Sequence, residues 1–305
     1  MDAAIEARGL VRHFGAVAAV DGIDLTVPVG SVYGFLGPNG SGKTTTIRML
    51  LGLLRPERGT VRLMGGSPRD AASLARVGAL VERPALYPYL SARENLLLFA
   101  TLAGMTGHEA DRAIDEALGV VGLGAVARRK AGGFSTGMLQ RLSMALVLLR
   151  DPSLVILDEP TNGLDPGGVV DVRALIAELA RSGRTVFLST HVLTEVEQLC
   201  DRVAVLQRGR LVADGLTREL LERGQRLAIG FDTHEEAARA AAVLAEAAIA
   251  TEIAGDDKDA LRVSLDGPSP SAINRLLAEH DLHPAELVVR RASLESVFLD
   301  LTEGV

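Results

Sequence analysis

The chain has 305 residues, of which 48% are hydrophobic and 23% are charged, with 32 basic against 39 acidic side chains. This composition is typical of a folded globular protein and excludes wholesale disorder, and the length favours about two domains. The charge is unevenly placed, because residues 1–225 hold 25 basic against 24 acidic residues and residues 226–305 hold 7 against 15. We therefore predict a nearly neutral domain over 1–225 and a separate acidic domain over 226–305.

Other features argue against secretion and against a membrane span. Cys200 is the single cysteine, so no intramolecular disulfide can form and a reducing compartment is favoured. The first residues include Asp2 and Glu6 and lack the basic and apolar regions of a secretory signal. Apolar stretches such as Leu142–Leu149 fall far short of the ~20 residues that span a bilayer. We therefore expect no direct membrane insertion.

The N-terminal part of the chain alternates apolar runs with turn signals, which predicts strands followed by a helix. The expected strands are Ile5–Val11, Ala16–Val20, Ile23–Val27 and Ser31–Leu36, and the expected helix is Thr44–Leu54. Residues 71–126 are predicted to be mostly helical from apolar residues at i, i+3 and i+4 spacing. Ser91, with Glu94 three residues later, predicts a capping box at the start of one of these helices.

Strands and helices alternate again from residue 140 onward. The expected elements are a helix over Leu139–Leu149, a strand over Leu154–Leu157, a helix over Val169–Ala180, a strand over Thr185–Ser189, a helix over Leu193–Cys200, and a hairpin of Val203–Gln207 with Arg210–Ala213. Alternation of this kind predicts a mainly parallel sheet flanked by helices, the α/β class.

The acidic tail follows a different order of elements. The expected elements are strands over Leu227–Phe231, Ala250–Ile253, Leu261–Leu265 and Glu286–Arg290, with helices over His234–Glu246, Ser271–His280 and Leu294–Leu301. This order is similar to a split βαβ, ferredoxin-like unit, so we predict a small α+β domain.

A glycine-rich loop over residues 37–45 fits the phosphate-loop pattern in the required context, after a strand and before a helix. Its glycines let backbone N–H groups converge on phosphate oxygens, and the helix start adds the positive end of its dipole. Lys43 supplies a charge for the β- and γ-phosphates, and the Thr44 hydroxyl can ligate Mg²⁺. The predicted nucleotide-binding residues are Gly37, Pro38, Asn39, Gly40, Ser41, Gly42, Lys43, Thr44 and Thr45.

The expected strand at Leu154–Leu157 ends in two carboxylates, Asp158 and Glu159. Beside a phosphate loop, the first carboxylate can reach the metal, and the second can orient and deprotonate an attacking water. We expect Asp158 to bind Mg²⁺ and Glu159 to be the catalytic base of a nucleoside triphosphatase.

The segment Phe134–Arg141 separates this chain from other P-loop enzymes, because it resembles the signature motif of ATP-binding cassette (ABC) proteins, LSGGQ-x-x-R. Three more segments look like motifs of that family: Asn162–Asp165 resembles the D-loop, Ser189–His191 the switch-histidine motif, and Arg12–Gly15 the aromatic A-loop. With the phosphate loop and the acidic strand end, six motifs stand in the family's order between Ile5 and about Asp214.

The resemblance implies a fold, a dimer and roles for several residues. The fold would be a P-loop NTPase cassette with a RecA-like parallel sheet, an antiparallel β subdomain and a helical subdomain at about 85–150. Two cassettes would pair head to tail around two ATP molecules with Mg²⁺. The implied residues are Phe14 against adenine, His191 at the γ-phosphate, Asp165 in the D-loop, and Ser135, Thr136, Gly137 and Met138 acting on the ATP of the other copy.

The chain departs from the family pattern in two places. The signature has Met138 in place of its glutamine and Thr136 in place of its first glycine. The stretch Gly78–Pro84 resembles the Q-loop, with Glu82 where a glutamine is usual. The resemblance therefore implies that Glu82 contacts the metal, as a charged ligand. Both departures resemble a subset of ABC-2-type ATPases that export drugs, antibiotics or bacteriocins.

We therefore expect a cytoplasmic ATPase that lies peripherally on the inner face of the membrane and powers a separate permease. Tyr87 or Tyr89 is expected to be partly exposed as an anchor for that partner. The alternatives are an importer ATPase, a soluble ABC ATPase acting on ribosomes or nucleic acid, and a regulatory module that does not hydrolyse ATP. The chain lacks the heptad run or basic tract of the soluble class. The regulatory module is disfavoured by the presence of Lys43, Asp158, Glu159 and His191.

The role of the acidic tail stays open between a dimer clamp, a regulatory or ligand-sensing domain and a fold-completing appendage. Its net charge disfavours binding to nucleic acid or to an anionic bilayer. Segment 293–302 resembles the closing helix of the same ABC-2-type proteins, and Phe298 and Leu301 are expected to be packing residues.

Overall fold

The computed structural model describes residues 2–81, 86–223, 226–253, 260–264 and 269–290. The chain divides into two compact units, Met1–Asp214 (unit 1) and Gly215–Val305 (unit 2). The boundary at 225/226 that we inferred from charge remains a prediction, and unit 2 begins before it, at Gly215.

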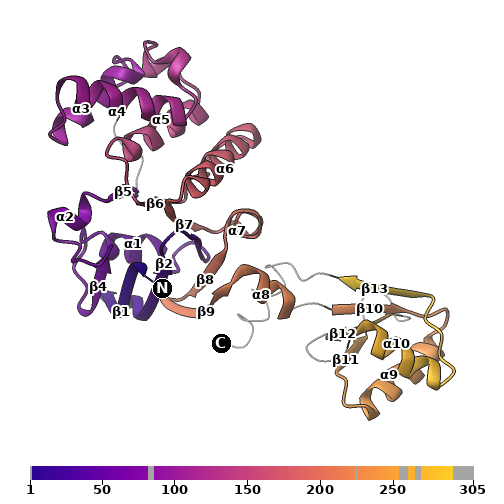
Figure 1. The fold of residues 1–305 in the computed structure, drawn as a ribbon. Coiled ribbons are helices and arrows are strands. Elements are labelled where there is room, and N and C mark those ends of the chain that lie inside the picture. Colours follow the sequence, from indigo (N-terminus) through magenta and orange to yellow (C-terminus); the bar gives the residue numbers. More distant parts are fainter. Residues whose placement is uncertain (1, 82–85, 224–225, 254–259, 265–268, 291–305) are drawn as a thin grey trace. The chain divides into compact units, whose positions relative to one another are not determined.

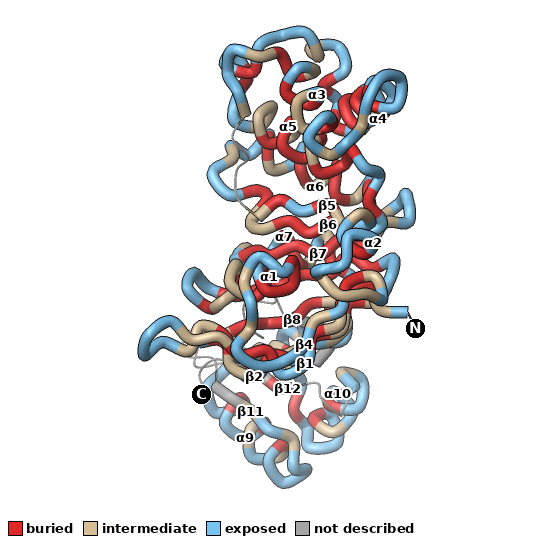
Figure 2. The backbone as a smooth tube through the Cα atoms, turned by 90° about the vertical axis from the view of Figure 1, so that its left-hand side faces the viewer, coloured by how far each residue is buried: buried red, intermediate tan, exposed pale blue. Residues whose placement is uncertain are grey.

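Unit 1 is built on a six-stranded sheet in the order β5-β6-β7-β3-β8-β9 (Figure 1). The strands are β3 (Val32–Leu36), β5 (Val77–Leu80), β6 (Leu154–Asp158), β7 (Thr185–Thr190), β8 (Arg202–Gln207) and β9 (Arg210–Leu216). The pairs β5–β6, β6–β7, β7–β3 and β3–β8 are parallel. Strands β3, β6 and β7 are almost wholly buried (Figure 2), which explains their continuous apolar sequences.

Strand β5 interrupts the segment 71–126, whose described residues are otherwise mostly helical, as predicted. Gly78 lies in the middle of this strand, where a Cβ atom would come within 2.5 Å of the Val147 carbonyl oxygen. The strand therefore uses small residues to let a helix approach closely, and it lacks the β-branched alternation that reveals a strand in a sequence.

A three-stranded antiparallel sheet, ordered β2-β1-β4, forms the second layer of unit 1. Its strands are β1 (Ala3–Phe14), β2 (Val17–Pro28) and β4 (Arg58–Leu63). Two strands predicted at 16–20 and 23–27 are one continuous strand, because Gly22, at φ 76°, forms a bulge where the register shifts between Ile23 and Asp21. Strand β4 was not predicted, because Val61 and Leu63 are its only apolar residues and Gly59 near its start is typical of a turn.

The helices of unit 1 lie in two groups (Figure 1). Around the sheets lie α1 (Lys43–Leu50), α2 (Ala71–Leu74), α6 (Pro166–Arg181) and α7 (Leu193–Leu199). A helical layer contains α3 (Ala92–Leu102), α4 (Gly107–Val120) and α5 (Thr136–Leu148), with 3-10 turns η1 (Gly124–Val126) and η2 (Ala131–Gly133). The predicted capping box is confirmed at α3, where the Glu94 N–H donates to the Ser91 hydroxyl and the Ser91 N–H donates to the Glu94 carboxylate.

Unit 2 holds a four-stranded antiparallel sheet in the order β11-β12-β10-β13. Its elements are α8 (Thr217–Arg223), β10 (Arg226–Gly230), α9 (His234–Glu246), β11 (Thr251–Ile253), β12 (Ala260–Ser264), α10 (Pro270–Glu279) and β13 (Glu286–Arg290). This strand order agrees with the predicted split βαβ unit. Leu227 and Ile229 of β10 share the buried core with Leu244 of α9 and Leu277 of α10. The predicted helix over Leu294–Leu301 lies outside the described residues.

Candidate active site

The phosphate loop lies between the end of β3 and the start of α1. The Gly37 N–H donates to the Thr190 carbonyl at 3.3 Å, which holds the loop against the end of β7. Helix α1 begins after Gly42, whose φ of 108° a side chain would strain, and it has no side-chain cap at this end. The first N–H groups of α1 are therefore left to bind an anion.

Two glycines of the loop, Gly37 and Gly42, stand where a side chain would collide with the backbone. A Cβ atom on Gly37 would come within 2.4 Å of the Leu206 carbonyl oxygen, and one on Gly42 within 2.2 Å of the Ala19 carbonyl oxygen. The Ser41 hydroxyl is buried and has no hydrogen-bond partner among the described residues. A narrow backbone cradle with an unpaired hydroxyl fits the phosphates of a nucleotide.

Lys43 is the buried cation of the loop, with 6% of its surface exposed. Its ammonium donates to the carbonyl oxygens of Gly37 at 2.7 Å and Pro38 at 3.2 Å, and lies 3.1 Å from Glu159 Oε1. The ammonium is thus held at the mouth of the loop by groups on both sides of the site.

Two hydroxyls hold Asp158 at the end of β6. Thr44 Oγ1 donates to Asp158 Oδ2 at 2.7 Å, and Ser189 Oγ donates to Asp158 Oδ1. No group of three or more His, Cys, Asp or Glu side chains suited to a metal occurs among the described residues. A cation here would be held by Thr44 and Asp158 and completed by phosphate oxygens and water, a donor set typical of Mg²⁺.

Glu159 turns out of β6 in a left-handed conformation, at φ 48°. Non-glycine residues in this conformation cost roughly 1 kcal/mol or more and cluster at functional sites. Its N–H donates to Ser189 Oγ at 3.0 Å, and its Oε2 lies 2.7 Å from His191 Nδ1. Lys43, Glu159 and His191 therefore form one continuous chain of polar contacts.

The segment after β7 is fixed by a buried carboxylate. Thr190 Oγ1 donates to Glu195 Oε2 at 2.8 Å and accepts from the Val192 N–H at 3.0 Å. The other oxygen of Glu195 lies 3.8 Å from the Arg173 guanidinium of α6. These contacts hold the backbone on both sides of His191, so the position of its imidazole is linked to helices α6 and α7.

The signature segment begins the helical layer's α5. Ser135 is its N-cap residue and is exposed, and its hydroxyl accepts from the Met138 N–H at 3.2 Å. Thr136 and Gly137 form the first turn of the helix. No hydrogen bond or ion pair within the described part of the chain joins Ser135–Met138 to the phosphate loop.

Gln140, on the same helix, ties the signature to the acidic strand end. Its buried amide donates to the Pro160 carbonyl at 2.7 Å, directly after Glu159. Asp165 lies further along this segment as the N-cap residue of α6, where its carboxylate accepts from the Gly168 N–H at 2.9 Å.

Phe14 lies at the tip of the β1–β2 hairpin with 50% of its surface exposed. The Arg12 guanidinium lies 5.1 Å from its ring centroid and so covers one part of the aromatic side chain. Arg12 is anchored in turn to the Arg55 carbonyl at 3.3 Å. The exposed part of Phe14 offers a surface on which a base can stack.

The structure thus brings together the phosphate loop, Asp158, Glu159 and His191, and it places the signature and Phe14 apart from them. Glu82, predicted to contact the metal, lies outside the described residues. Ser189 and Gln140 were missed as site residues. Their hydrogen bonds join positions 31 and 20 residues apart, and no local pattern in the sequence reports such pairs.

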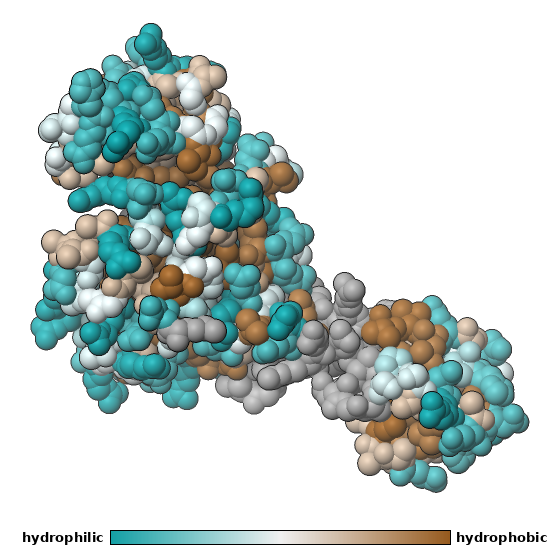
Figure 3. Space-filling view, viewed as in Figure 1, coloured by the Kyte–Doolittle hydropathy of each residue, from teal (hydrophilic) through white to brown (hydrophobic). Residues whose placement is uncertain are grey.

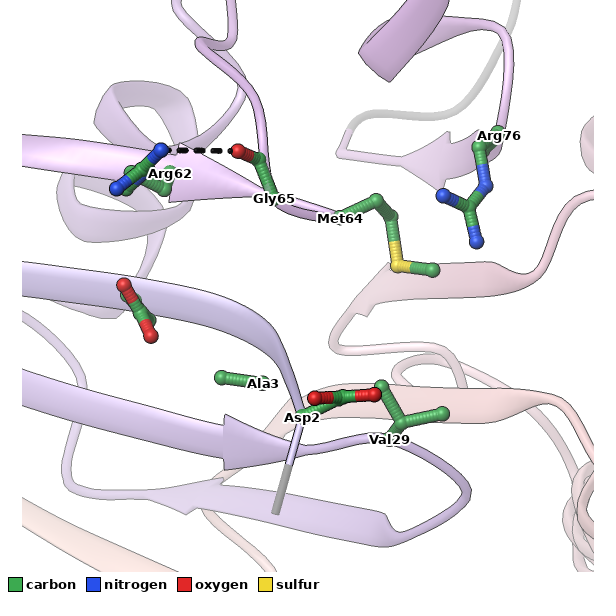
Figure 4. Close-up of a pocket in the computed structure, with 8 residues that line it drawn as sticks. Asp2, Ala3, Val29, Arg62, Met64, Gly65 and Arg76 are labelled. Carbon is green, nitrogen blue, oxygen red and sulfur yellow. Dashed lines mark hydrogen bonds between the residues drawn. The ribbon is translucent and has the colours of Figure 1, made fainter.

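A second cavity, of about 530 Å³, lies near the N-terminal end of β1 (Figure 4). Arg62 and Arg76 line it together with Asp2 and Glu6, and Arg62 donates to the Gly65 carbonyl at 3.2 Å. No residue of the phosphate loop lines this cavity, so it is separate from the site above. Among the described residues, no helix is long and apolar enough to cross a bilayer.

Comparison with known proteins places this geometry in a family. Residues 20–162 match the family described as "ABC transporter". The bacitracin transport ATP-binding protein BcrA of Bacillus licheniformis is 38% identical across 100% of this chain and 99% of its own length. The daunorubicin/doxorubicin resistance ATP-binding protein DrrA of Streptomyces peucetius is 39% identical across 98% of this chain and 92% of its own.

A solved structure shows the same fold. The structure of cbiO1 from Clostridium perfringens, part of the ABC transporter complex cbiONQ, has a TM-score of 0.66 and 27% identity, and the match covers 72% of this chain and 91% of that one. With relatives aligned over nearly their whole length, the chain belongs to the ABC transporter family and is one of its ATP-hydrolysing, ATP-binding proteins.

Proposed function

We propose that this chain is the ATPase subunit of an ABC exporter for drugs, antibiotics or peptides, working with a separate membrane-spanning permease. The observation that carries the proposal is the polar chain from Lys43 through Glu159 to His191, set beside the Thr44–Asp158 pair at the mouth of the phosphate loop. BcrA and DrrA are bacitracin transport and drug resistance proteins by name, which favours export over the importer and soluble alternatives.

Binding would use the loop as a phosphate cradle. The first N–H groups of α1 and the unpaired Ser41 hydroxyl would donate to the phosphates, and Lys43 would neutralise their charge. Phosphate oxygens compete with Glu159 for the Lys43 ammonium, which now lies 3.1 Å from that carboxylate. ATP binding would therefore release one oxygen of Glu159 for work on a water molecule, while Phe14 stacks on the adenine.

Hydrolysis would follow from the carboxylate that is released. Glu159 accepts a proton from water as the water oxygen bonds to the γ-phosphorus, and the bond from that phosphorus to the bridging oxygen breaks. The electron pair leaves with ADP, and inorganic phosphate remains. His191, hydrogen-bonded to Glu159, would orient the carboxylate and contact the γ-phosphate. Mg²⁺, held by Thr44 and Asp158, would offset the negative charge of the phosphates.

Two copies would complete each site. Ser135 is exposed at the start of α5, and no hydrogen bond among the described residues joins it to the phosphate loop of its own chain, which supports a role on ATP bound to another copy. A head-to-tail pair related by a two-fold axis would place each signature on the partner's ATP. Asp165 would lie in the D-loop at the same interface.

The permease would bind the helical layer. Tyr87 and Tyr89 are both exposed, Tyr89 by 63%, and their rings pack edge to face at 5.8 Å. A groove of about 330 Å³ lies between β5 and helices α3 and α5, and Phe99 and Leu146 contribute to its apolar lining. Exposed aromatic anchors and an apolar groove are both features that suit a helix from a membrane protein. This partner would hold the chain at the inner face of the membrane.

The decisive test is Glu159→Gln, which keeps the size and shape of the side chain and removes the base, because an uncharged amide does not accept a proton from water. We expect ATP binding to persist, hydrolysis to fall about 10³-fold, and a stable dimer to form with ATP and Mg²⁺, measured by phosphate release and analytical ultracentrifugation. Glu178→Gln, on the exposed side of α6, is the matched control and should behave as wild type. A Glu159→Gln protein that hydrolyses ATP at the wild-type rate would disprove the base assignment.

A further inference from the structure

Glu195 is a carboxylate that lies in the interior of unit 1. Hydrophilic side chains cover much of the face of unit 1 that Figure 3 shows, as is usual for charged residues, whereas only 2% of Glu195 is exposed. It lies in the first turn of α7, four residues after His191. Burying a charge costs free energy unless the charge is paired and hydrogen-bonded, so the partners of Glu195 indicate its role. No step of the proposed hydrolysis uses this carboxylate.

The two oxygens of Glu195 have partners on different elements. Oε2 accepts from the Thr190 hydroxyl at 2.8 Å, at the end of β7. Oε1 lies 3.8 Å from the Arg173 guanidinium of α6, and that guanidinium also donates to Gln198 of α7 at 2.8 Å. Glu195 therefore joins β7, α6 and α7 at one point.

Thr190 fixes the backbone at the active site through its hydroxyl and its carbonyl. The hydroxyl donates its hydrogen to Glu195, and the same oxygen accepts from the Val192 N–H at 3.0 Å. The carbonyl accepts from the Gly37 N–H of the phosphate loop at 3.3 Å. His191 lies between the two residues that this hydroxyl joins, so its backbone is held on both sides.

We propose that Glu195 is a positioning residue for hydrolysis, which holds His191 against Glu159 by orienting the Thr190 hydroxyl. The inference rests on the proposed function, in which His191 orients the Glu159 carboxylate. Because 40% of the His191 side chain is exposed, its direction depends on the backbone that carries it. Without an acceptor for its hydrogen, the Thr190 hydroxyl is no longer oriented to accept from the Val192 N–H. The imidazole then loses its place 2.7 Å from Glu159 Oε2.

Two substitutions of Glu195 separate the hydrogen bond from the rest of the side chain. Glu195→Leu keeps a side chain of similar size and removes both oxygens, so kcat for ATP hydrolysis should fall about tenfold, with KM nearly unchanged. Glu195→Gln keeps an amide oxygen that can accept from the Thr190 hydroxyl, and it should retain most of kcat. Equal losses of kcat in the two variants would overturn the proposed route through this hydroxyl.

A double-mutant cycle with His191→Ala tests whether Glu195 acts through the histidine. Glu195→Leu should lower kcat in the wild-type background and have no further effect in the His191→Ala background, because the imidazole that it positions is gone. An equal fall of kcat in both backgrounds would overturn the positioning role and leave the proposed function standing. A His191→Ala protein with the wild-type kcat would remove the histidine from the proposed function, and the positioning role with it.

Thr190→Val is the second test, for use where Glu195→Leu does not fold. Valine has the shape of threonine without the hydroxyl, so kcat should again fall about tenfold, and Thr190→Ser, which keeps a hydroxyl, should recover most of it. Thr185→Val is the matched control, because Thr185 is also buried on β7 and its hydroxyl accepts from the Gly30 N–H at 2.9 Å, at the other end of the strand.

The melting temperature separates a positioning role from a structural one in this pair. Both valine variants remove a buried hydrogen bond and should lower the melting temperature, but only Thr190→Val should lower kcat. A loss of kcat in Thr185→Val as large as that in Thr190→Val would show a general effect of losing a buried hydroxyl, and would overturn the proposal.

Discussion

The parallel sheet of unit 1 and the antiparallel sheet of unit 2 use their strand ends in different ways. Strands β3, β6 and β7 are parallel, so their carboxyl ends lie together, and the residues that follow them supply Lys43, Asp158, Glu159 and His191 to one place. In unit 2 neighbouring strands end at opposite sides of the sheet. Parallel topology gathers polar groups into a site, which antiparallel topology does not do by itself.

The two units also differ in charge. Residues 1–214 carry 23 basic against 22 acidic side chains, and residues 215–305 carry 9 against 17. Unit 1 needs near neutrality to accept a triphosphate, whose charge an acidic domain would repel. The residues proposed to bind and hydrolyse ATP therefore all lie in unit 1.

The largest expected effect tests whether the two units fold independently. Ile229→Ala removes buried methyl groups from the core of unit 2 and should destabilise that unit by about 3 kcal/mol. Amide hydrogen exchange should show lost protection in β10, β12 and α9, with β3, β6 and β7 unchanged. Leu53→Ala, at an exposed site in unit 1, should change neither. Equal loss of protection in both units would show that they unfold together.

The second prediction concerns the polar chain at the active site. His191→Ala should lower the rate of ATP hydrolysis about 10²-fold, because Glu159 loses the imidazole that holds its Oε2. The melting temperature should stay near the wild-type value, since 40% of the His191 side chain is exposed. His108→Ala, at an exposed position of α4, controls for loss of an imidazole elsewhere. A fall in rate that matches a fall in melting temperature would point to a structural role.

The third prediction tests the link between the signature helix and the acidic strand end. Gln140→Leu leaves the Pro160 carbonyl unpaired and should destabilise unit 1 by about 2 kcal/mol, measured by urea unfolding. It should also lower hydrolysis, because Pro160 directly follows Glu159. Gln198→Leu removes an exposed hydrogen bond to Arg173 and should cost much less. Equal costs for the two variants would mean that burial of the Gln140 bond does not matter.

Part of the active site was predicted from the sequence, because those residues are neighbours along the chain. Residues 37–45 and the pair Asp158–Glu159 are consecutive, so their types and order suffice to identify them. Ser189 and Gln140 act through partners far along the chain, which only the folded backbone brings near. The predicted roles of the site residues remain proposals. The geometry does bring five of them together, namely Lys43, Thr44, Asp158, Glu159 and His191.

The fold of unit 2 was predicted well, and its function was not. The spacing of apolar residues predicted its strands and helices. In a small two-layer domain each strand and helix buries one face and exposes the other, so its apolar residues recur with the period of that element. Strands β4 and β5 of unit 1 were missed for the opposite reason. Charged residues interrupt β4. In β5, Gly78 allows helix α5 to approach closely, but glycine has a low propensity for strands.

The smallest expected effect is a pH dependence of stability at the capping box of α3. Helix α9 of unit 2 is the reference for this measurement. The pKa of Glu94 is lowered, chiefly because its carboxylate accepts the Ser91 backbone N–H and then because it interacts with the Ser91 side chain. A carboxyl whose pKa is lower in the folded state stabilises that state above its unfolded pKa. This contribution is lost as the pH falls through the folded pKa.

The wild-type protein should therefore be more stable than Glu94→Gln at pH 7, and the gap should close as the pH falls toward 3. Urea unfolding at several pH values measures that gap. Hydrogen exchange of the amides in α3 is then compared with that of the amides in α9. Glu116→Gln, an exposed glutamate of α4 paired with Arg112 at 3.8 Å, is the matched control. A gap that widens in acid would have the wrong sign for a carboxylate held by an N–H donor, and would remove the capping box as its cause.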